Sequence, residues 1–92
     1  MTITDDMTIS QTGNALSTEV DGEMVLIGLE TGRYFGLDAI GTAIWKRIEL
    51  PCRVDALCTG LAEDFDGDPA LISAETRAFL ERLVEQDLAR VD

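Results

Sequence analysis

The side chains with the widest chemical repertoire in this sequence are two cysteines. Cys52 and Cys58 are the only cysteines, and the chain contains no histidine, so it lacks a zinc-ligand set and the usual base for a thiol nucleophile. Two residues separated by six positions do not share one face of a helix, which disfavours a disulfide between them. We therefore predict that both cysteines are structural residues.

An acidic loop is the second candidate for chemistry. Asp64, Asp66 and Asp68 alternate around Gly67, an arrangement that partly resembles a calcium-binding loop. The calcium pattern requires its glycine after the third acidic position and a bidentate Glu further on, where this chain has Ala74. The sequence also has no phosphate-binding glycine loop and no nucleophile elbow. We therefore predict a protein without catalytic residues, metal or cofactor.

The net charge excludes several classes of partner. The chain has 18 acidic and 7 basic side chains and a formal net charge of −11, and such a field repels nucleic-acid phosphates and anionic lipid head groups. The longest apolar stretch, Met24 to Leu29, is far shorter than the roughly 20 residues that span a bilayer. The acidic N-terminus lacks the basic start of a signal peptide. We therefore expect a cytoplasmic protein that binds neither nucleic acid nor membrane.

The length of 92 residues fits one folded domain with a short N-terminal extension. Residues 1–14 mix β-branched and acidic types without a sustained period, so we expect a flexible segment that at most adds a loosely held strand. Residues 15–92 form the predicted domain. The composition, 46% hydrophobic and 27% charged, is typical of a globular chain.

Three extended runs begin the domain, namely ALSTEV, EMVLIGLE and RYFGL. Asp21 and Gly22 separate the first two runs, and Asp-Gly in this position is typical of a tight hairpin whose turn residues take positive φ. Gly32 supplies the left-handed residue of the second turn. We predict an antiparallel meander in which the third run, which is short and comes last, lies at the edge of the sheet.

Three helices are predicted after the strands. Asp38 is in the N-cap position of the first helix, and Pro51 stops that helix. The second helix covers about residues 54–65 and contains no basic residue, so it does not suit a helix that reads DNA. The third helix covers about residues 69–86 and has Asp68 as its cap.

The third predicted helix has two apolar edges. At 100° per residue, Ile72, Phe79 and Leu83 share one face, whereas Leu80 and Val84 point about 80 to 100° away from it. We expect the first face to pack in the core. For the second edge two interpretations are equally good: Leu80 and Val84 line a groove, or they pack against the sheet.

The segment EMVLIGLETGRYFGLDAIGTAIWKRIE resembles the signature region of PqqD-like proteins, also called precursor-peptide recognition elements. In that family a strand ends in Gly, a basic residue and aromatics, followed by Leu-Asp and a helix that contains Gly and Ile-Trp. The matching positions here are Gly32, Arg33, Tyr34, Phe35, Leu37, Asp38, Gly41, Ile44 and Trp45. The C-terminal pattern of the family, FLxxLxxxxL, is matched by Phe79, Leu80, Leu83 and Leu88. The resemblance covers about residues 15–91, and it departs from the family at Asp87, where relatives usually have Gly.

The resemblance implies a fold and a binding mode. The fold is α+β and winged helix-turn-helix-like, with a three-stranded antiparallel sheet packed on three helices. The binding mode is the addition of a leader peptide as a further strand to the third strand, in the cleft beside the third helix. The residues expected to bind the leader peptide are Arg33, Tyr34, Phe35, Gly36, Leu37, Arg77, Leu80, Glu81 and Val84. Tyr34 and Gly36 face one way and Phe35 and Leu37 the other, and this alternation alone does not choose which pair borders the peptide.

The resemblance also implies the function of a non-catalytic peptide chaperone. Such a protein captures the leader of a ribosomally synthesised precursor peptide and presents it to a separate processing enzyme. The aromatic-rich GRYFGLD segment favours the leader peptidase of lasso peptide biosynthesis as that enzyme. Two alternatives stay open: a PqqD-type chaperone that serves a radical enzyme in pyrroloquinoline quinone synthesis, and a generic winged-helix protein-interaction module. We expect a monomer or a weak dimer.

Overall fold

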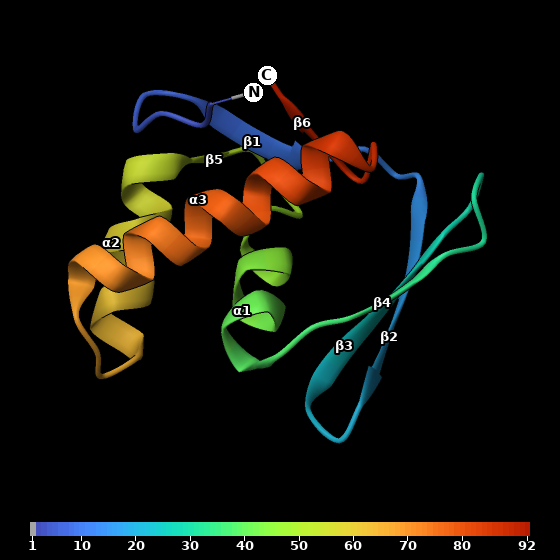
Figure 1. Cartoon of the computed structure of the whole chain (residues 1–92), viewed down its shortest axis with the longest axis horizontal. Helices are drawn as coiled ribbons and strands as arrows, with labels where there is room; N and C mark the ends of the chain where they lie inside the picture. Colours follow the sequence, from blue (N-terminus) through green and yellow to red (C-terminus); the bar gives the residue numbers. More distant parts are fainter. Residues whose placement is uncertain (1) are drawn as a thin grey trace.

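The computed structural model describes residues 2–92, and within that range it shows three helices and two antiparallel three-stranded sheets (Figure 1). One sheet has the strand order β2-β3-β4 and the other β5-β1-β6. The elements in chain order are β1 (Thr8–Gln11), β2 (Ala15–Val20), β3 (Glu23–Gly28), β4 (Tyr34–Gly36), α1 (Ala39–Arg47), β5 (Cys52–Arg53), α2 (Val54–Asp64), α3 (Pro69–Glu85) and β6 (Ala89–Val91). The architecture confirms the predicted α+β, winged helix-turn-helix-like class and adds a second sheet that was not predicted.

The β2-β3-β4 meander follows the local turn chemistry. Asp21 and Gly22 have φ values of 52° and 84°, and Gly32 has a φ of 70°, which confirms both predicted turns. β2 pairs with β3 along its whole length, and β3 pairs with β4. β4 therefore lies at the edge of this sheet, as predicted.

Two aspartates fix where α1 and α3 begin. The Asp38 side chain accepts a hydrogen bond from the Gly41 N–H at 2.8 Å, and the Asp68 side chain accepts one from the Ala70 N–H at 3.0 Å. Both predicted caps are confirmed. After α3 ends, Asp87 has a φ of 59°, so an aspartate here adopts the left-handed conformation for which helix ends usually use glycine.

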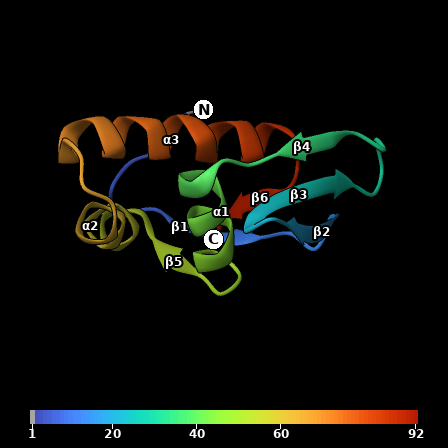
Figure 2. The same cartoon turned by 90° about the horizontal axis from the view of Figure 1, so that it is seen from below.

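The hydrophobic core draws on all three helices and on both sheets. Figure 2 shows α1 at the centre of the molecule, where Ile44 and Trp45 are buried, as is Leu83 of α3. Leu80 is also fully buried, whereas Phe79, which we expected in the core, is only half-buried. The buried stripe of α3 is therefore rotated from the predicted one. None of the helices in residues 2–92 is long and apolar enough to cross a membrane.

The N-terminal segment differs most from expectation. β1 is the central strand of the second sheet, where Thr8 pairs with Arg53 of β5 and Ile9 with Val91 of β6. The side chains of Ile3 and Ile9 are 1% and 0% exposed. The expectation of a flexible segment over residues 1–14 is thus wrong for its described part, because these residues pair with distant strands and fill part of the core.

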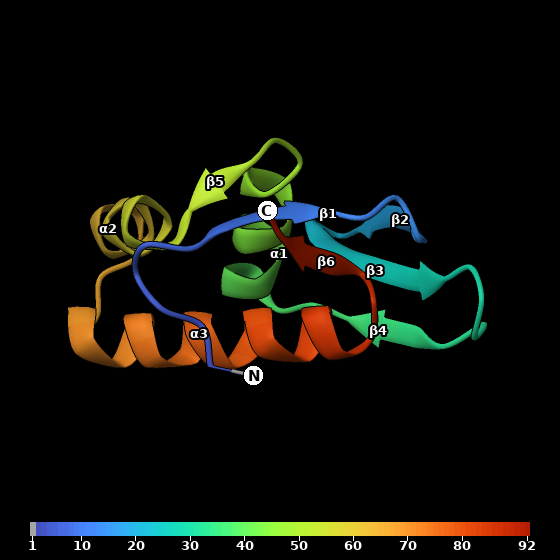
Figure 3. The same ribbon diagram turned by 90° about the horizontal axis from the view of Figure 1, so that it is seen from above.

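The same segment also covers one side of α3, which it crosses in Figure 3 before entering β1. The Ile3 N–H donates a hydrogen bond to the Glu81 carboxylate at 3.3 Å, and Arg77 forms an ion pair with Asp5. The side of α3 that carries Arg77 and Glu81 is therefore occupied by the chain itself.

Two buried threonines give a matched test of hydrogen bonding in the core. Thr76 is fully buried, and its hydroxyl has no hydrogen-bond partner among residues 2–92. Thr42 is also buried, but its hydroxyl accepts a bond from the Met24 N–H at 2.9 Å. Thr76→Val should raise the free energy of unfolding by about 1 kcal/mol, and Thr42→Val should lower it by about 1–2 kcal/mol. Urea unfolding of both variants checks the pair, and equal losses of stability would contradict it.

Candidate functional site

The free edge of β4 faces α3. In Figures 2 and 3 the strands β2, β3 and β4 follow one another toward that helix. Among residues 2–92, β4 has a strand neighbour on one side only, since the sheet order is β2-β3-β4. An edge of this kind carries backbone N–H and C=O groups that have no ladder partner.

The hydrogen-bond pattern of the β3–β4 ladder identifies these unpaired groups. The Leu37 N–H donates to the Met24 C=O at 2.8 Å. Hydrogen-bonded pairs alternate along an antiparallel ladder, so the backbone of Phe35 is directed toward β3. The N–H and C=O groups of Tyr34 and Gly36 therefore point to the open edge.

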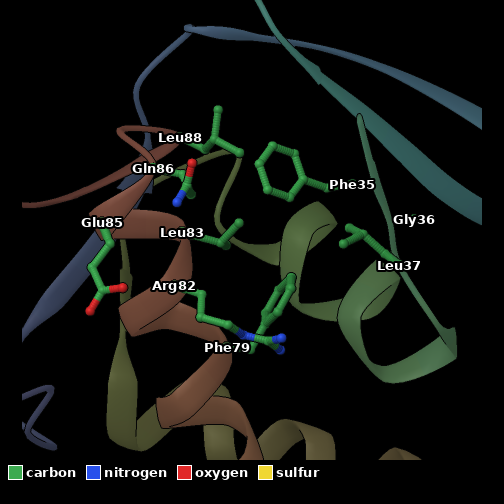
Figure 4. A pocket seen from close by; sticks show the side chains of 9 residues that line it. All are labelled: Phe35, Gly36, Leu37, Phe79, Arg82, Leu83, Glu85, Gln86 and Leu88. Carbon is green, nitrogen blue, oxygen red and sulfur yellow. The ribbon is translucent and has the colours of Figure 1, made fainter. Parts of the chain in front are cut away.

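A pocket of about 360 Å³ lies between β4 and α3 (Figure 4). Its walls are mostly apolar, and Figure 4 shows Phe35 pointing from β4 toward Leu83 and Leu88. We call this pocket, together with the open edge of β4, the groove. The residues that line the pocket are Phe35, Gly36, Leu37, Phe79, Arg82, Leu83, Glu85, Gln86 and Leu88.

One end of the groove is formed by a stacked pair on α3. The guanidinium carbon of Arg82 lies 5.7 Å from the ring centroid of Phe79, within the range of a cation–π contact. Both residues also line a neighbouring pocket of about 260 Å³, which includes Asp38 and Glu75. The two pockets therefore adjoin at Phe79 and Arg82, and the second one extends toward the start of α1.

The strand residues predicted from the sequence lie at this site. Phe35 and Leu37 face α3 and line the pocket, and Leu37 is 7% exposed. Tyr34 is on the opposite face of the sheet and is 74% exposed. The hydrogen-bonding groups and the apolar surface of this segment thus come from alternate residues. The backbones of Tyr34 and Gly36 point to the open edge, and the side chains of Phe35 and Leu37 line the pocket.

The predicted helix residues lie elsewhere. Arg77 and Glu81 contact the N-terminal segment, Leu80 is buried in the core, and Val84 is half-buried against it. At 100° per residue, Arg77 and Glu81 are about 160 to 200° from Phe79 around the helix axis. The structure therefore separates Arg77, Leu80, Glu81 and Val84 from the pocket beside β4.

Instead, α3 lines the pocket with Phe79, Arg82, Leu83 and Glu85, and its C-cap residue Gln86 also lines it. Phe79 and Leu83 were expected in the core, and Arg82 and Gln86 were not among the predicted leader-binding residues. The available signal was the helical spacing of Phe79, Arg82 and Gln86, which places an aromatic, a cation and an amide on one face.

Neither cysteine lines the groove, and among the described residues no cluster of three metal-ligating side chains occurs. Cys52 and Cys58 are free and half-buried. Burial raises the pKa of the Cys52 thiol, and the nearby Arg47 offsets part of this rise.

The raised pKa predicts slow alkylation of Cys52. A higher pKa keeps the thiol protonated at neutral pH, so less of the reactive thiolate is present than for an ordinary cysteine. In the Cys58→Ser variant, where Cys52 alone reports, the iodoacetamide rate relative to a free cysteine should rise with pH and level off above the raised pKa. A ratio that does not change with pH would contradict this expectation.

An open strand edge beside an apolar groove is the arrangement by which sheet domains receive extended peptide segments through strand addition. The fold and the groove therefore define a winged-helix-like domain with the geometry of the peptide-docking class. The chain belongs to the PqqD family, since the family model described as Coenzyme PQQ synthesis protein D (PqqD) matches residues 23–89. This match confirms the resemblance seen in the sequence. No curated protein sequence matches the chain.

Solved structures share the fold. TbiB1, solved in complex with the TbiA(beta) leader peptide, is 31% identical, and the match covers 88% of this chain and 94% of TbiB1 with a TM-score of 0.78. Two more distant structures show similarity of fold alone. A lasso peptide synthetase B1 complexed with the leader peptide is 17% identical, and the match covers 89% of this chain and 96% of that one with a TM-score of 0.76. The PqqD truncation of Methylobacterium extorquens PqqCD, a stand-alone RiPP recognition element, is 21% identical, and the match covers 96% of this chain and 94% of that one with a TM-score of 0.77.

Proposed function

We propose that this protein binds the leader segment of a ribosomally synthesised precursor peptide and has no catalytic activity of its own. The leader docks as an extended strand along β4, in the groove beside α3. The observation that carries the proposal is the pair of outward-facing backbones at Tyr34 and Gly36, next to an apolar pocket of about 360 Å³. The likeness to TbiB1, which was solved with a leader peptide, supports it.

The two parts of the groove contribute differently to binding. Main-chain hydrogen bonds from Tyr34 and Gly36 supply affinity for any extended segment, and pockets for alternate side chains select the sequence. We infer that the leader contacts Arg33 to Leu37, the segment that contains β4, and Phe79, Arg82, Leu83 and Gln86 on α3 and at its C-cap. The earlier candidates Arg77, Leu80, Glu81 and Val84 are left out because they lie on other sides of α3.

We further propose that the bound precursor is presented to a separate leader peptidase in lasso peptide biosynthesis, in the cytoplasm, where ribosomes make the precursor. The aromatic-rich GRYFGLD segment favours this setting, and the lasso peptide synthetase B1 shares the fold. The alternative partner is a radical enzyme of pyrroloquinoline quinone synthesis, for which the Methylobacterium extorquens PqqD structure provides the fold likeness. Neighbouring genes distinguish the two, since a peptidase and a cyclase mark the first and a radical enzyme the second.

Isothermal titration of the whole protein with the leader of the precursor encoded nearby tests the binding function. We expect one peptide per protein, with a negative heat-capacity change from burial of the groove. The free protein is expected to be a monomer or a weak dimer. If a dimer forms through the open edge of β4, binding of the leader should dissociate it. The absence of binding to a nearby leader would contradict the proposal.

A further inference from the structure

The basic side chains of this protein are distributed unevenly between paired and unpaired positions. The chain has seven basic residues and 18 acidic ones, so carboxylates are available in excess. Within residues 2–92, five basic side chains form ion pairs with carboxylates: Lys46, Arg47, Arg53, Arg77 and Arg90. Arg33 and Arg82 form no such pair among these residues.

Both unpaired arginines are next to the groove. Arg82 lines the pocket beside β4 and stacks on Phe79, and Figure 4 shows its guanidinium group against that ring. Arg33 directly precedes β4, and its C=O continues the ladder by accepting a hydrogen bond from the Gly28 N–H at 2.9 Å. The Arg33 side chain is exposed and lies one residue before the strand that lines the pocket.

The carboxylates that line the two pockets form no ion pair with these arginines. Glu85 lines the pocket, but in Figure 4 its carboxylate points away from Arg82. Asp38 and Glu75 line the neighbouring pocket together with Arg82 without forming an ion pair with it. In a protein with a net charge of −11, one arginine without an ion pair thus lines the pocket and another lies just before the open edge of β4.

Resting on the function proposed above, we propose that the bound segment carries acidic side chains opposite Arg33 and Arg82. Arginine binds a carboxylate in a bidentate fashion, which adds geometric specificity to the contact. Side chains on one face of an extended peptide recur every second residue, so two acidic side chains that reach the arginines from one face are at positions i and i+2, or at another even offset. The overall negative charge disfavours acidic peptides elsewhere on the surface, so the two arginines select the sequence and its register.

Selection from a random library of linear peptides of roughly 12 residues, displayed on mRNA, tests the proposal with the whole protein as bait. Enriched peptides should contain Asp or Glu at two positions with an even spacing. Arg82→Glu should weaken binding of a selected peptide about tenfold, and changing the facing acid of the peptide to Lys should restore it. Arg53→Glu is the matched control, since Arg53 pairs with Asp55 on α2, away from the groove, and it should change affinity less than twofold.

The outcomes separate this proposal from the proposed function. In one outcome, the enriched peptides fail to bind Gly36→Pro, and so need the β4 edge, but show no preference for acidic residues. This outcome would overturn the acidic-peptide proposal alone. Peptides that bind Gly36→Pro as well as the unchanged protein would overturn the docking site, and this proposal with it. Equal responses to Arg82→Glu and Arg53→Glu would show that only net charge matters, which would also overturn the proposal.

Discussion

Gly36→Pro is expected to weaken leader binding about 10- to 100-fold while the protein stays folded. The Gly36 N–H points to the open edge of β4, so proline removes a donor that the bound strand uses and leaves the β3 ladder unchanged. A side-chain atom added at Gly36 meets no neighbour within 4 Å, and Phe35 before it is already extended, as a residue preceding proline should be. Titration calorimetry gives the affinity, and circular dichroism checks the fold.

Two variants control this experiment. Gly36→Ala adds a side chain in the same open space but keeps the N–H, so it should bind within about twofold of the unchanged protein. Phe35→Pro removes an N–H that is directed toward Leu26 of β3, so it should destabilise the sheet itself. Similar binding by Gly36→Pro and Gly36→Ala would show that the β4 edge does not hold the peptide.

Ile9→Ala is expected to lower the free energy of unfolding by about 2–5 kcal/mol, a large share of the 5–15 kcal/mol typical of a small domain. Ile9 is 0% exposed and lies in the central strand of the second sheet. Deletion of residues 1–12 removes Ile3 as well and leaves β5 and β6 without the strand between them, so the cooperative unfolding transition should be lost. Urea and thermal unfolding followed by circular dichroism measure both effects.

Leu16→Ala is the matched control for this prediction. Leu16 is an aliphatic strand residue of similar size that is 60% exposed on β2, so its truncation should change stability by less than about 0.5 kcal/mol. If the deletion variant unfolded with the same midpoint and cooperativity as the whole chain, the N-terminal segment would be the dispensable extension that its sequence suggested.

The parts of the fold that depend on neighbouring residues were predictable from the sequence. The Asp21-Gly22 turn needs positive φ at two consecutive residues, and the caps at Asp38 and Asp68 need a short acidic side chain before a helix. Each signal is local, and each prediction is confirmed. The edge position of β4 followed from the same local order of turns and strands.

The second sheet was not predictable in this way. β1 is short, and its sequence TISQ has no marked alternation. Its partners are a two-residue strand after α1 and a three-residue strand at the C-terminus. Pairing between such distant short strands is decided by tertiary packing, for which a single sequence contains no periodic signal.

The difference between the predicted helix face and the face that lines the pocket follows from that omission. With the N-terminal segment taken as flexible, the edge of α3 with Leu80 and Val84 was free to line a groove. In the structure, Asp5 and Ile3 contact the neighbouring residues Arg77 and Glu81. The groove is therefore on the opposite side of the helix.

Amide hydrogen exchange at β4, measured by NMR with and without the bound leader peptide, tests the central claim most directly. In the free protein the Phe35 amide, which is directed toward β3, should exchange slowly, whereas the Tyr34 and Gly36 amides should exchange fast. Saturation with the leader should slow exchange at Tyr34 and Gly36 to the level of Phe35. If the peptide binds and these two amides still exchange at their free rates, docking by strand addition to β4 is contradicted.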